Sequence, residues 1–316
     1  MCFGICKRIV MCMQSHEIVV SISCITYNHA QYIRQCLDGF LMQKTNFAFE
    51  VLIHDDASTD GTTDIIKEYE AKYPDIIKPI YEEENQWIKG RRGSSVFNFP
   101  RAKGKYIALC EGDDCWTDSL KLQKQVDFLD KNQEYALSCH GYIELDESNG
   151  EYYDWTPKDF DIITLDKFIN GHCCVTTLSV MFRYQMLLQS NYFKYKHQMD
   201  IPLFYSLLSL GQGYYMPNKM AIYRKHYGGV WSSGSSEEKW TISFKAKMEI
   251  LEVENNGMAS KYMYEFLLIP ESRLTMLRHA RDISFAIVVI CKYCGLKYAI
   301  NIISFILLKK TLFNLK

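Results

Sequence analysis

Apolar strands and amphipathic helices alternate between residues 17 and 130. The apolar runs Ile18–Ile25, Phe49–Ile53 and Tyr106–Cys110 predict strands, whereas Ala30–Gln43 has apolar residues at helical spacing. Strand–helix–strand repeats predict a parallel sheet with right-handed crossovers and helices on both faces. The chain is therefore expected to belong to the α/β class. Because ligands bind at the carboxyl ends of strands in open α/β sheets, these ends are the expected place for a site.

Polar or acidic residues follow each of these three strands. They are Thr26–His29 after the first strand, residues 55–62 (DDASTDGT) after the second, and Glu111–Asp114 (EGDD) after the third. Clustered carboxylates repel one another, and a divalent cation among them would offset that cost. Mg²⁺ and Mn²⁺ prefer carboxylate oxygens and often share them with substrate phosphates. The clusters predict a cation that holds a diphosphate, and the alternative is a set of solvated acidic turns.

Four segments resemble the family 2 glycosyltransferases, which have the GT-A fold. They are Val20–Ile33, residues 55–62, Ala102–Trp116 (AKGKYIALCEGDDCW) and Tyr223–Trp231 (YRKHYGGVW). The resemblance implies a Rossmann-like nucleotide-sugar-binding sheet and an inverting, metal-dependent transferase of the bacterial surface-polysaccharide type. Its donor is expected to be a UDP-sugar, and its acceptor a hydroxyl group of a glycan or lipid-linked glycan.

The resemblance also assigns residues to the nucleotide. Tyr27 is expected to stack on the base, although a packed turn residue is the alternative, and Asp56 is expected to accept the N3–H of uracil. Asp113 is expected to contact the ribose or a bridging water. Arg224 is expected to neutralise phosphate.

For the cation, Mn²⁺ or Mg²⁺, the resemblance implies Asp114 as the direct ligand, with His226 beside it; the role of Glu111 stays open. A lone histidine is often structural. For the general base that deprotonates the acceptor, it implies Asp200, which precedes an expected helix. Asp200 also fits a helix N-cap, and one residue can do both. Weaker candidates for the base are Asp154, Asp159 and Asp161.

Three other classes of protein compete with a transferase. A nucleotidyltransferase would carry a glycine-rich basic loop after the first strand, but residues 26–30 contain no glycine. A Rossmann dehydrogenase would show G-x-G-x-x-G after the first strand, and this motif is absent. A non-catalytic carbohydrate- or membrane-binding protein on a transferase scaffold is the remaining alternative, against which the retained acidic residues argue. A net charge of −1 gives no basic field for nucleic acid.

Composition divides the chain into an N-terminal tail (1–16), a GT-A domain (17–236) and a helical C-terminal region (237–316). The chain has twelve cysteines, but the C-x-x-C at 291–294 lacks the second pair that a structural zinc site needs. Reduced thiols in a cytoplasmic protein are therefore expected.

The segment 283–308 is strongly apolar, but Lys292 and Lys297 interrupt it and Lys309 and Lys310 close it. These charges disfavour a membrane span, which needs about 20 apolar residues. One interpretation is an interfacial helix that holds the protein at the inner face of the cell membrane. The other is a helix that packs on the protein itself or in a homodimer.

Overall fold

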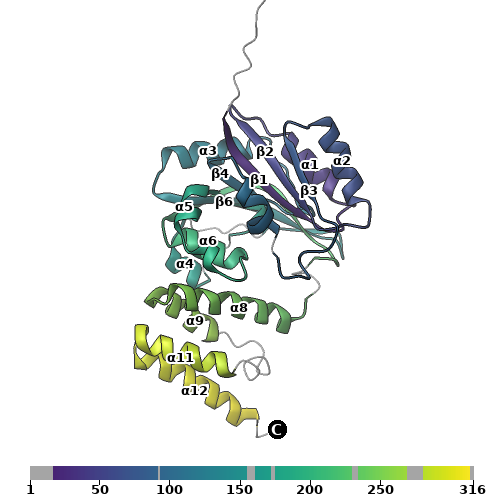
Figure 1. The fold of residues 1–316 in the computed structure, drawn as a ribbon. Helices are drawn as coiled ribbons and strands as arrows, with labels where there is room; N and C mark the ends of the chain where they lie inside the picture. The colour runs from purple at the N-terminus through teal and green to yellow at the C-terminus, as the bar shows by residue number, and fades with distance from the viewer. Residues whose placement is uncertain are drawn as a thin grey trace, which may run out of the picture.

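A computed structural model shows a curled mixed sheet flanked by helices, with further helices stacked beneath it (Figure 1). The expected α/β class is confirmed. The structure describes residues 17–91, 93–154, 161–171, 175–229, 234–268 and 280–313.

One half of the sheet is parallel, as the alternation of strands and helices predicts. Its strand order is β3-β2-β1-β4, and each neighbouring pair runs in the same direction. The strands are β1 (Ile18–Thr26), β2 (Ala48–Asp55), β3 (Ile77–Tyr81) and β4 (Tyr106–Leu109). The helices α1 (Ile33–Leu41) and α2 (Thr62–Lys72) connect the first three of them.

The other half of the sheet is mixed, and the alternation of strands and helices between residues 17 and 130 made no prediction about its direction. β9 runs antiparallel to both β4 and β6, whereas β10 runs parallel to β6 and antiparallel to β5. The direction changes because the β6–β7 hairpin reverses the chain before β8 and β9 join the sheet. These strands are β5 (Cys115–Trp116), β6 (Tyr135–Asp146), β7 (Glu151–Asp154), β8 (Ile162–Ile163), β9 (Met181–Arg183) and β10 (Gln212–Lys225).

The remaining helices lie beside and below the sheet. α8 begins with a capping box, in which the Ser235 hydroxyl accepts the N–H of Glu238 and the Glu238 carboxylate accepts the N–H of Ser235. The helices are α3 (Lys121–Lys131), α4 (Leu165–Ile169), α5 (Tyr184–Gln189), α6 (Asp200–Leu208), α8 (Ser236–Glu254), α9 (Gly257–Leu268), α11 (Ala280–Cys294) and α12 (Leu296–Phe313). Short helical turns are η1 (Ser94–Asn98), η2 (Phe99–Arg101), η3 (Thr177–Ser179) and η4 (Tyr192–Lys194).

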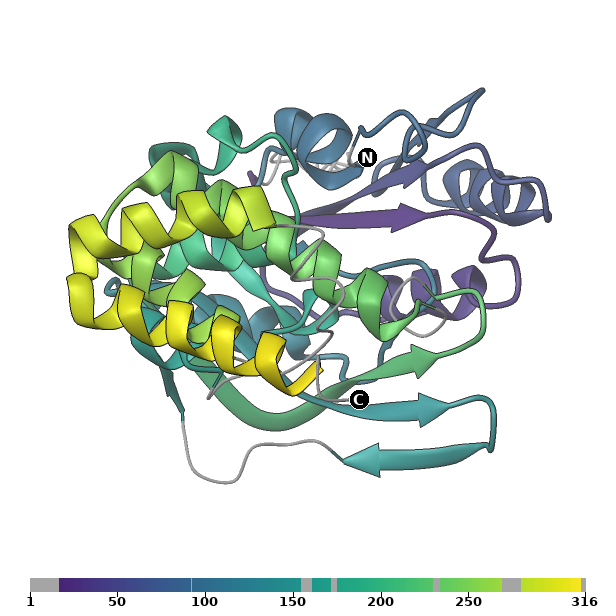
Figure 2. The same ribbon diagram turned by 90° about the horizontal axis from the view of Figure 1, so that it is seen from below.

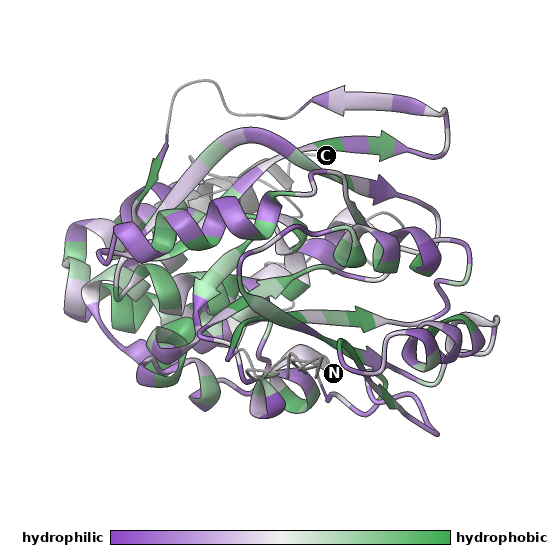
Figure 3. Cartoon of the chain, turned by 90° about the horizontal axis from the view of Figure 1, so that it is seen from above, coloured by the Kyte–Doolittle hydropathy of each residue, from purple (hydrophilic) through white to green (hydrophobic). Residues whose placement is uncertain are grey.

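Two hydrophobic clusters hold these elements together. One lies between the parallel strands and α1, α2 and α3, and includes Val20, Phe40 and Leu122. The other runs without a break from the sheet through α6, α8 and α9 to Ile302 of α12. Figure 3 shows hydrophobic colour along the middle strands of the sheet. The division after residue 236 thus stays a prediction, because continuous packing crosses it.

Candidate active site

The carboxyl ends of β1, β2 and β4 meet at one edge of the sheet, because these strands are parallel neighbours. The loops after them are tied together by backbone hydrogen bonds. The N–H of Asp56 donates to the carbonyl of Thr26 at 3.0 Å, and the N–H of Gly112 donates to the carbonyl of Ile25 at 2.9 Å. The three polar segments that follow the strands therefore share one site.

The DDASTDGT turn holds the loop after β1 in place. The Ser58 hydroxyl accepts the N–H of Asn28 at 2.9 Å, and the Thr62 hydroxyl accepts the N–H of His29 at 2.8 Å. The Asp60 carboxylate accepts the N–H of Ala30 at 2.9 Å. The side chains of this turn thus fix the backbone that carries His29.

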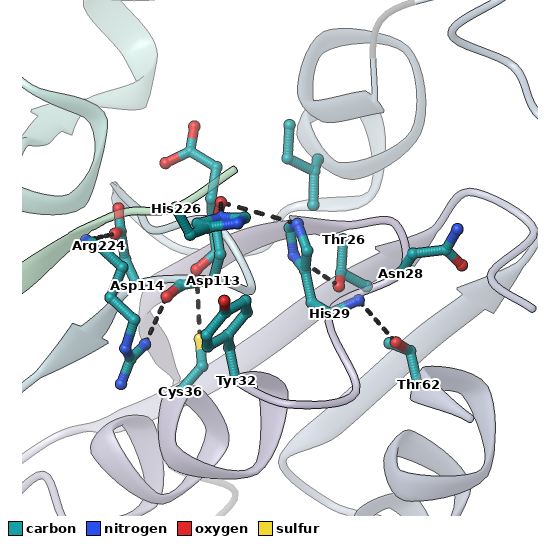
Figure 4. A network of polar contacts seen from close by, with 12 residues as sticks. Thr26, Asn28, His29, Tyr32, Cys36, Thr62, Asp113, Asp114, Arg224 and His226 are labelled. Carbon is teal, nitrogen blue, oxygen red and sulfur yellow. Dashed lines mark hydrogen bonds and ion pairs between the residues drawn. The ribbon is translucent and has the colours of Figure 1, made fainter. Parts of the chain in front are cut away.

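His29, Asp113 and His226 point toward one another (Figure 4). His226 Nε2 lies 3.1 Å from Asp113 Oδ2, and His29 Nε2 lies 3.7 Å from the same oxygen. A ligand atom from each residue falls within 4.8 Å of the other two. His29 Nδ1 is 3.1 Å from the Thr26 hydroxyl, so Thr26 helps to orient the ring. Two imidazole nitrogens and a carboxylate oxygen can bind a divalent cation.

Burial and neighbouring charges shift the pKa values of His29 and Asp113 in this cluster. Burial lowers the pKa of His29, which favours the neutral ring. Burial alone would raise the pKa of Asp113, but the hydrogen bond with His226 and the neighbouring histidine rings hold it below its usual range. No role was predicted for His29 from the sequence. Its place in the same loop as Tyr27, at the end of the first strand, could have indicated that it belongs to the site.

Asp114 lies apart from the two histidines. Its side chain is 2% exposed, and its Oδ1 accepts the backbone N–H of Arg224 at 2.9 Å. Burial, followed by the charges of Asp113 and Glu111, raises its pKa well above the usual range. The structure therefore brings Asp113, and not Asp114, together with His226. The assignment of Asp114 as a cation ligand stays a prediction.

Arg224 is a buried brace in this structure. Its guanidinium donates to the backbone carbonyl of Asp113 and to the Gln35 side chain, and it lies 5.4 Å from the centre of the Tyr32 ring. The contact with phosphate stays a prediction. The next residue, Lys225, pairs with Asp146 at 2.6 Å.

Tyr27 and Asp56 lie on neighbouring loops at the strand ends. Tyr27 is 45% exposed, so its ring is accessible to a ligand. The Asp56 carboxylate accepts the backbone N–H groups of Gln86 and Trp87 at 2.6 and 3.1 Å. Asp56 thereby anchors the loop after β3. Its contact with uracil stays a prediction.

Asp200, at the start of α6, lies near enough to Glu111 for the two charges to interact. It is the first residue of α6, and its Oδ1 accepts the N–H of Ile201 at 2.8 Å; Met199 holds the N-cap position. Burial raises the pKa of Asp200. Burial also raises the pKa of Glu111 to about 7, against a hydrogen bond from Thr177, and the charges of Asp113 and Asp200 add to this increase. The carboxylates of Asp200 and Glu111 are thus close enough to affect each other's ionisation.

The weaker candidates for the base lie elsewhere. Asp154, on β7, is exposed and pairs with Lys219. Asp161 is exposed, and its backbone carbonyl accepts the N–H of Tyr215 at 2.6 Å. Asp159 lies outside the described residues.

Helix α8 braces the segment that leads into Asp200. The Glu249 carboxylate accepts the backbone N–H of His197 at 2.8 Å and also contacts the His197 ring. Glu254 accepts the hydroxyl of Tyr195 at 2.7 Å. The C-terminal region thus touches the loop that positions Asp200.

A Glu249→Ala variant is expected to lower turnover about tenfold while donor binding stays unchanged, because the loop before Asp200 loses a charged hydrogen-bond partner. Steady-state kinetics with donor titration would measure this. Glu252→Ala, an exposed position on the same helix, is the matched control. Equal kinetics for both variants would contradict a positioning role for Glu249.

Comparisons with known proteins agree with this architecture. The model of the family "Glycosyl transferase family 2" matches residues 21–186. An uncharacterized protein of Mycobacterium tuberculosis is 33% identical over 251 residues; the match covers 76% of this chain but only 66% of that relative. The Escherichia coli protein WfaP, named a UDP-Glc:alpha-D-GlcNAc-diphosphoundecaprenol beta-1,3-glucosyltransferase, is 28% identical over 213 residues, or 67% of this chain and 79% of WfaP.

Among solved structures, residues 1–349 of TarS from S. aureus in complex with UDP-GlcNAc superpose with a TM-score of 0.64 at 18% identity. The superposition covers 86% of this chain and 82% of TarS. At this level of identity the likeness concerns the fold alone, and it confirms the expected GT-A type.

Proposed function

Because the chain belongs to glycosyl transferase family 2, whose model matches slightly more than half of its 316 residues, we propose that it transfers a sugar from a nucleotide-diphosphate donor to an acceptor hydroxyl. The observation that carries this proposal is the meeting of His29, Asp113 and His226 at the strand ends. Asp200, the first residue of α6, lies near enough to Glu111 of the acidic segment for their charges to interact.

The donor is proposed to lie across the loops after β1 and β2. Tyr27 would stack on the base, and Asp56 would accept a base N–H. Because Asp56 also anchors the loop after β3, donor binding would be coupled to the order of that loop. WfaP is named for UDP-Glc and the TarS structure is a complex with UDP-GlcNAc, which supports a UDP-sugar. Arg224 would support the diphosphate indirectly by fixing the backbone of Asp113.

The residues present fit a divalent cation, since three ligand atoms of suitable chemistry converge. We propose Asp113, His226 and His29 as its ligands, which keeps His226 from the set predicted from the sequence; Asp114, the other member of that set, stays the alternative to Asp113. A bound Mn²⁺ or Mg²⁺ would offset the negative charge that develops on the leaving diphosphate.

Asp200 is proposed as the general base of a single, inverting displacement. Its carboxylate would take the proton of the acceptor hydroxyl as that oxygen forms a bond to the anomeric carbon. The bond from this carbon to the diphosphate oxygen would break on the opposite side, so that no covalent enzyme intermediate is needed.

The acceptor is proposed to be a glycan or a lipid-linked glycan, because WfaP is named for a diphosphoundecaprenol acceptor. A lipid-linked acceptor would place the enzyme at the cytoplasmic face of the cell membrane. None of the helices in the described part of the chain is long and apolar enough to cross a membrane. A homodimer also remains a proposal.

A screen of nucleotide sugars would test the proposed function. We expect Mn²⁺-dependent hydrolysis of one UDP-sugar above all GDP-sugars, with faster turnover once a glycan or lipid-diphosphate acceptor is added. Calorimetric binding of UDP without turnover of any donor or acceptor would instead favour the alternative, a non-catalytic binding protein on a transferase scaffold.

A further inference from the structure

The last two helices form an antiparallel hairpin on the side of the molecule away from the sheet. α11 and α12 are joined at Gly295, whose φ of 95° is a left-handed conformation that glycine adopts readily. Figure 2 shows the two helices side by side, with one face turned outward. The inner face is buried and includes Ile283, Ala286, Ile290 and Ile302. The hairpin is therefore fixed to the protein by one face only.

The outer face of the hairpin is unusually apolar. Of the nineteen large hydrophobic residues exposed in the described part of the chain, seven lie between residues 285 and 303. They are Phe285, Val288, Tyr293, Leu296, Tyr298, Ile300 and Ile303. Spacings of three and four residues align Phe285 with Val288 on α11, and Leu296 with Ile300 and Ile303 on α12. The Tyr298 ring instead packs on Tyr264 of α9. Exposed apolar surface at this density marks a place of contact with a partner.

The charge of this region indicates which partner it is. Residues 283–316 contain five lysines and no aspartate or glutamate, so they carry +5. Since the whole chain carries −1, residues 1–282 carry −6 (−1 − 5). Lys292 and Lys297 are exposed among the apolar residues of the outer face. The nearest acidic residue along the chain is the exposed Asp282 in the first turn of α11. A surface whose charged residues after Asp282 are all lysines, beside apolar side chains, complements an anionic lipid headgroup layer.

A second copy of the chain fits this face less well. In a twofold contact the same patch would meet itself, so the exposed Lys292 and Lys297 of both copies would lie in one interface. Such a contact would have no acidic residue from 283–316 to offset the repulsion. An anionic membrane would instead attract these lysines, so this repulsion would not arise.

We propose that the outer face of α11 and α12 docks on an anionic membrane surface. The apolar stripe enters the boundary between headgroups and acyl chains, and the lysines contact the phosphates. The hairpin lies on the membrane and does not span it. This proposal goes beyond the transfer reaction, and vesicle binding tests it whether or not the protein is active.

The experiment is vesicle flotation of the full chain. Neutral phosphatidylcholine vesicles are compared with vesicles containing about one third phosphatidylglycerol, at low and high salt. We expect binding to the anionic vesicles alone, weakened at high salt because charge contributes to it. Lys292→Glu/Lys297→Glu should lower binding at least about tenfold. Val288→Ser/Leu296→Ser should also lower binding, including at low salt.

Matched controls carry the same changes elsewhere. Lys131→Glu/Lys245→Glu alters two exposed lysines of α3 and α8, and Leu188→Ser/Leu210→Ser alters two exposed leucines outside the hairpin. Both controls should bind vesicles normally, and unchanged circular dichroism would show that the hairpin variants are folded. Absence of vesicle binding by the unaltered chain would overturn the proposal. Suppose that the unaltered chain does not bind vesicles but forms a dimer in sedimentation experiments. If Val288→Ser/Leu296→Ser then loses the dimer, the face belongs to a second copy of the chain.

Discussion

An Asp113→Asn variant is expected to lose more than about 100-fold in affinity for Mn²⁺ and to transfer sugar at a background rate. Loss of a residue that only supports a metal ligand costs about 10- to 100-fold, so loss of a charged ligand should cost more. Asparagine keeps the size of the side chain but removes the negative charge that lies between His29 and His226. Calorimetry with Mn²⁺ and turnover with the identified donor would measure the two effects.

The adjacent aspartate provides the control. Asp114→Asn should keep Mn²⁺ affinity within a few fold, because an amide oxygen can still accept the N–H of Arg224 and because the Asp114 side chain points away from the two histidines in Figure 4. The reverse pattern, in which Asp114→Asn abolishes Mn²⁺ binding and Asp113→Asn does not, would restore Asp114 as the ligand and refute the proposed cluster. His29→Gln should weaken binding as well if His29 is the third ligand.

The sequence could predict the parallel half of the sheet because the relevant information is local. Each strand from Ile18 to Leu109 ends in a polar loop, and the helices between β1, β2 and β3 have their own apolar spacing. The mixed half depends on long-range pairing. The strand Met181–Arg183 is three residues long and pairs antiparallel with both β4 and β6. Nothing in three residues encodes the direction in which they enter a sheet.

At the site, the sequence predicts which loops meet but not which way their side chains point. Asp113 and Asp114 are adjacent, and the turn between β4 and β5 sends one toward the histidines and the other toward Arg224. Gly112 fits this turn tightly, because a Cβ there would lie 2.6 Å from the hydroxyl of Thr26. Such close packing is a property of the folded loops. For the same reason, the charge of Arg224 was evident from the sequence, but its role as a buried brace was not.

An Asp200→Asn variant is expected to bind the donor normally and to lose about 10²–10⁴-fold in turnover, the usual contribution of a general base. The amide keeps an oxygen that can accept the N–H of Ile201, so α6 should begin as before. Asp154→Asn and Asp161→Asn, which alter exposed candidates, should stay near the unaltered rate. Turnover of Asp200→Asn within about threefold of that rate would leave Asp200 without a catalytic role.

The pH profile provides a second readout for Asp200. Burial raises its pKa, and the N–H of Ile201 and the charge of Lys247 only partly oppose that shift. Because the base acts in its ionised form, kcat/KM should fall as the pH decreases through this raised pKa. Asp200→Asn should remove that acidic limb and leave a low, flatter profile. If the acidic limb persists unchanged in the variant, another group takes the proton, and Glu111, whose charge interacts with that of Asp200, becomes the next residue to test.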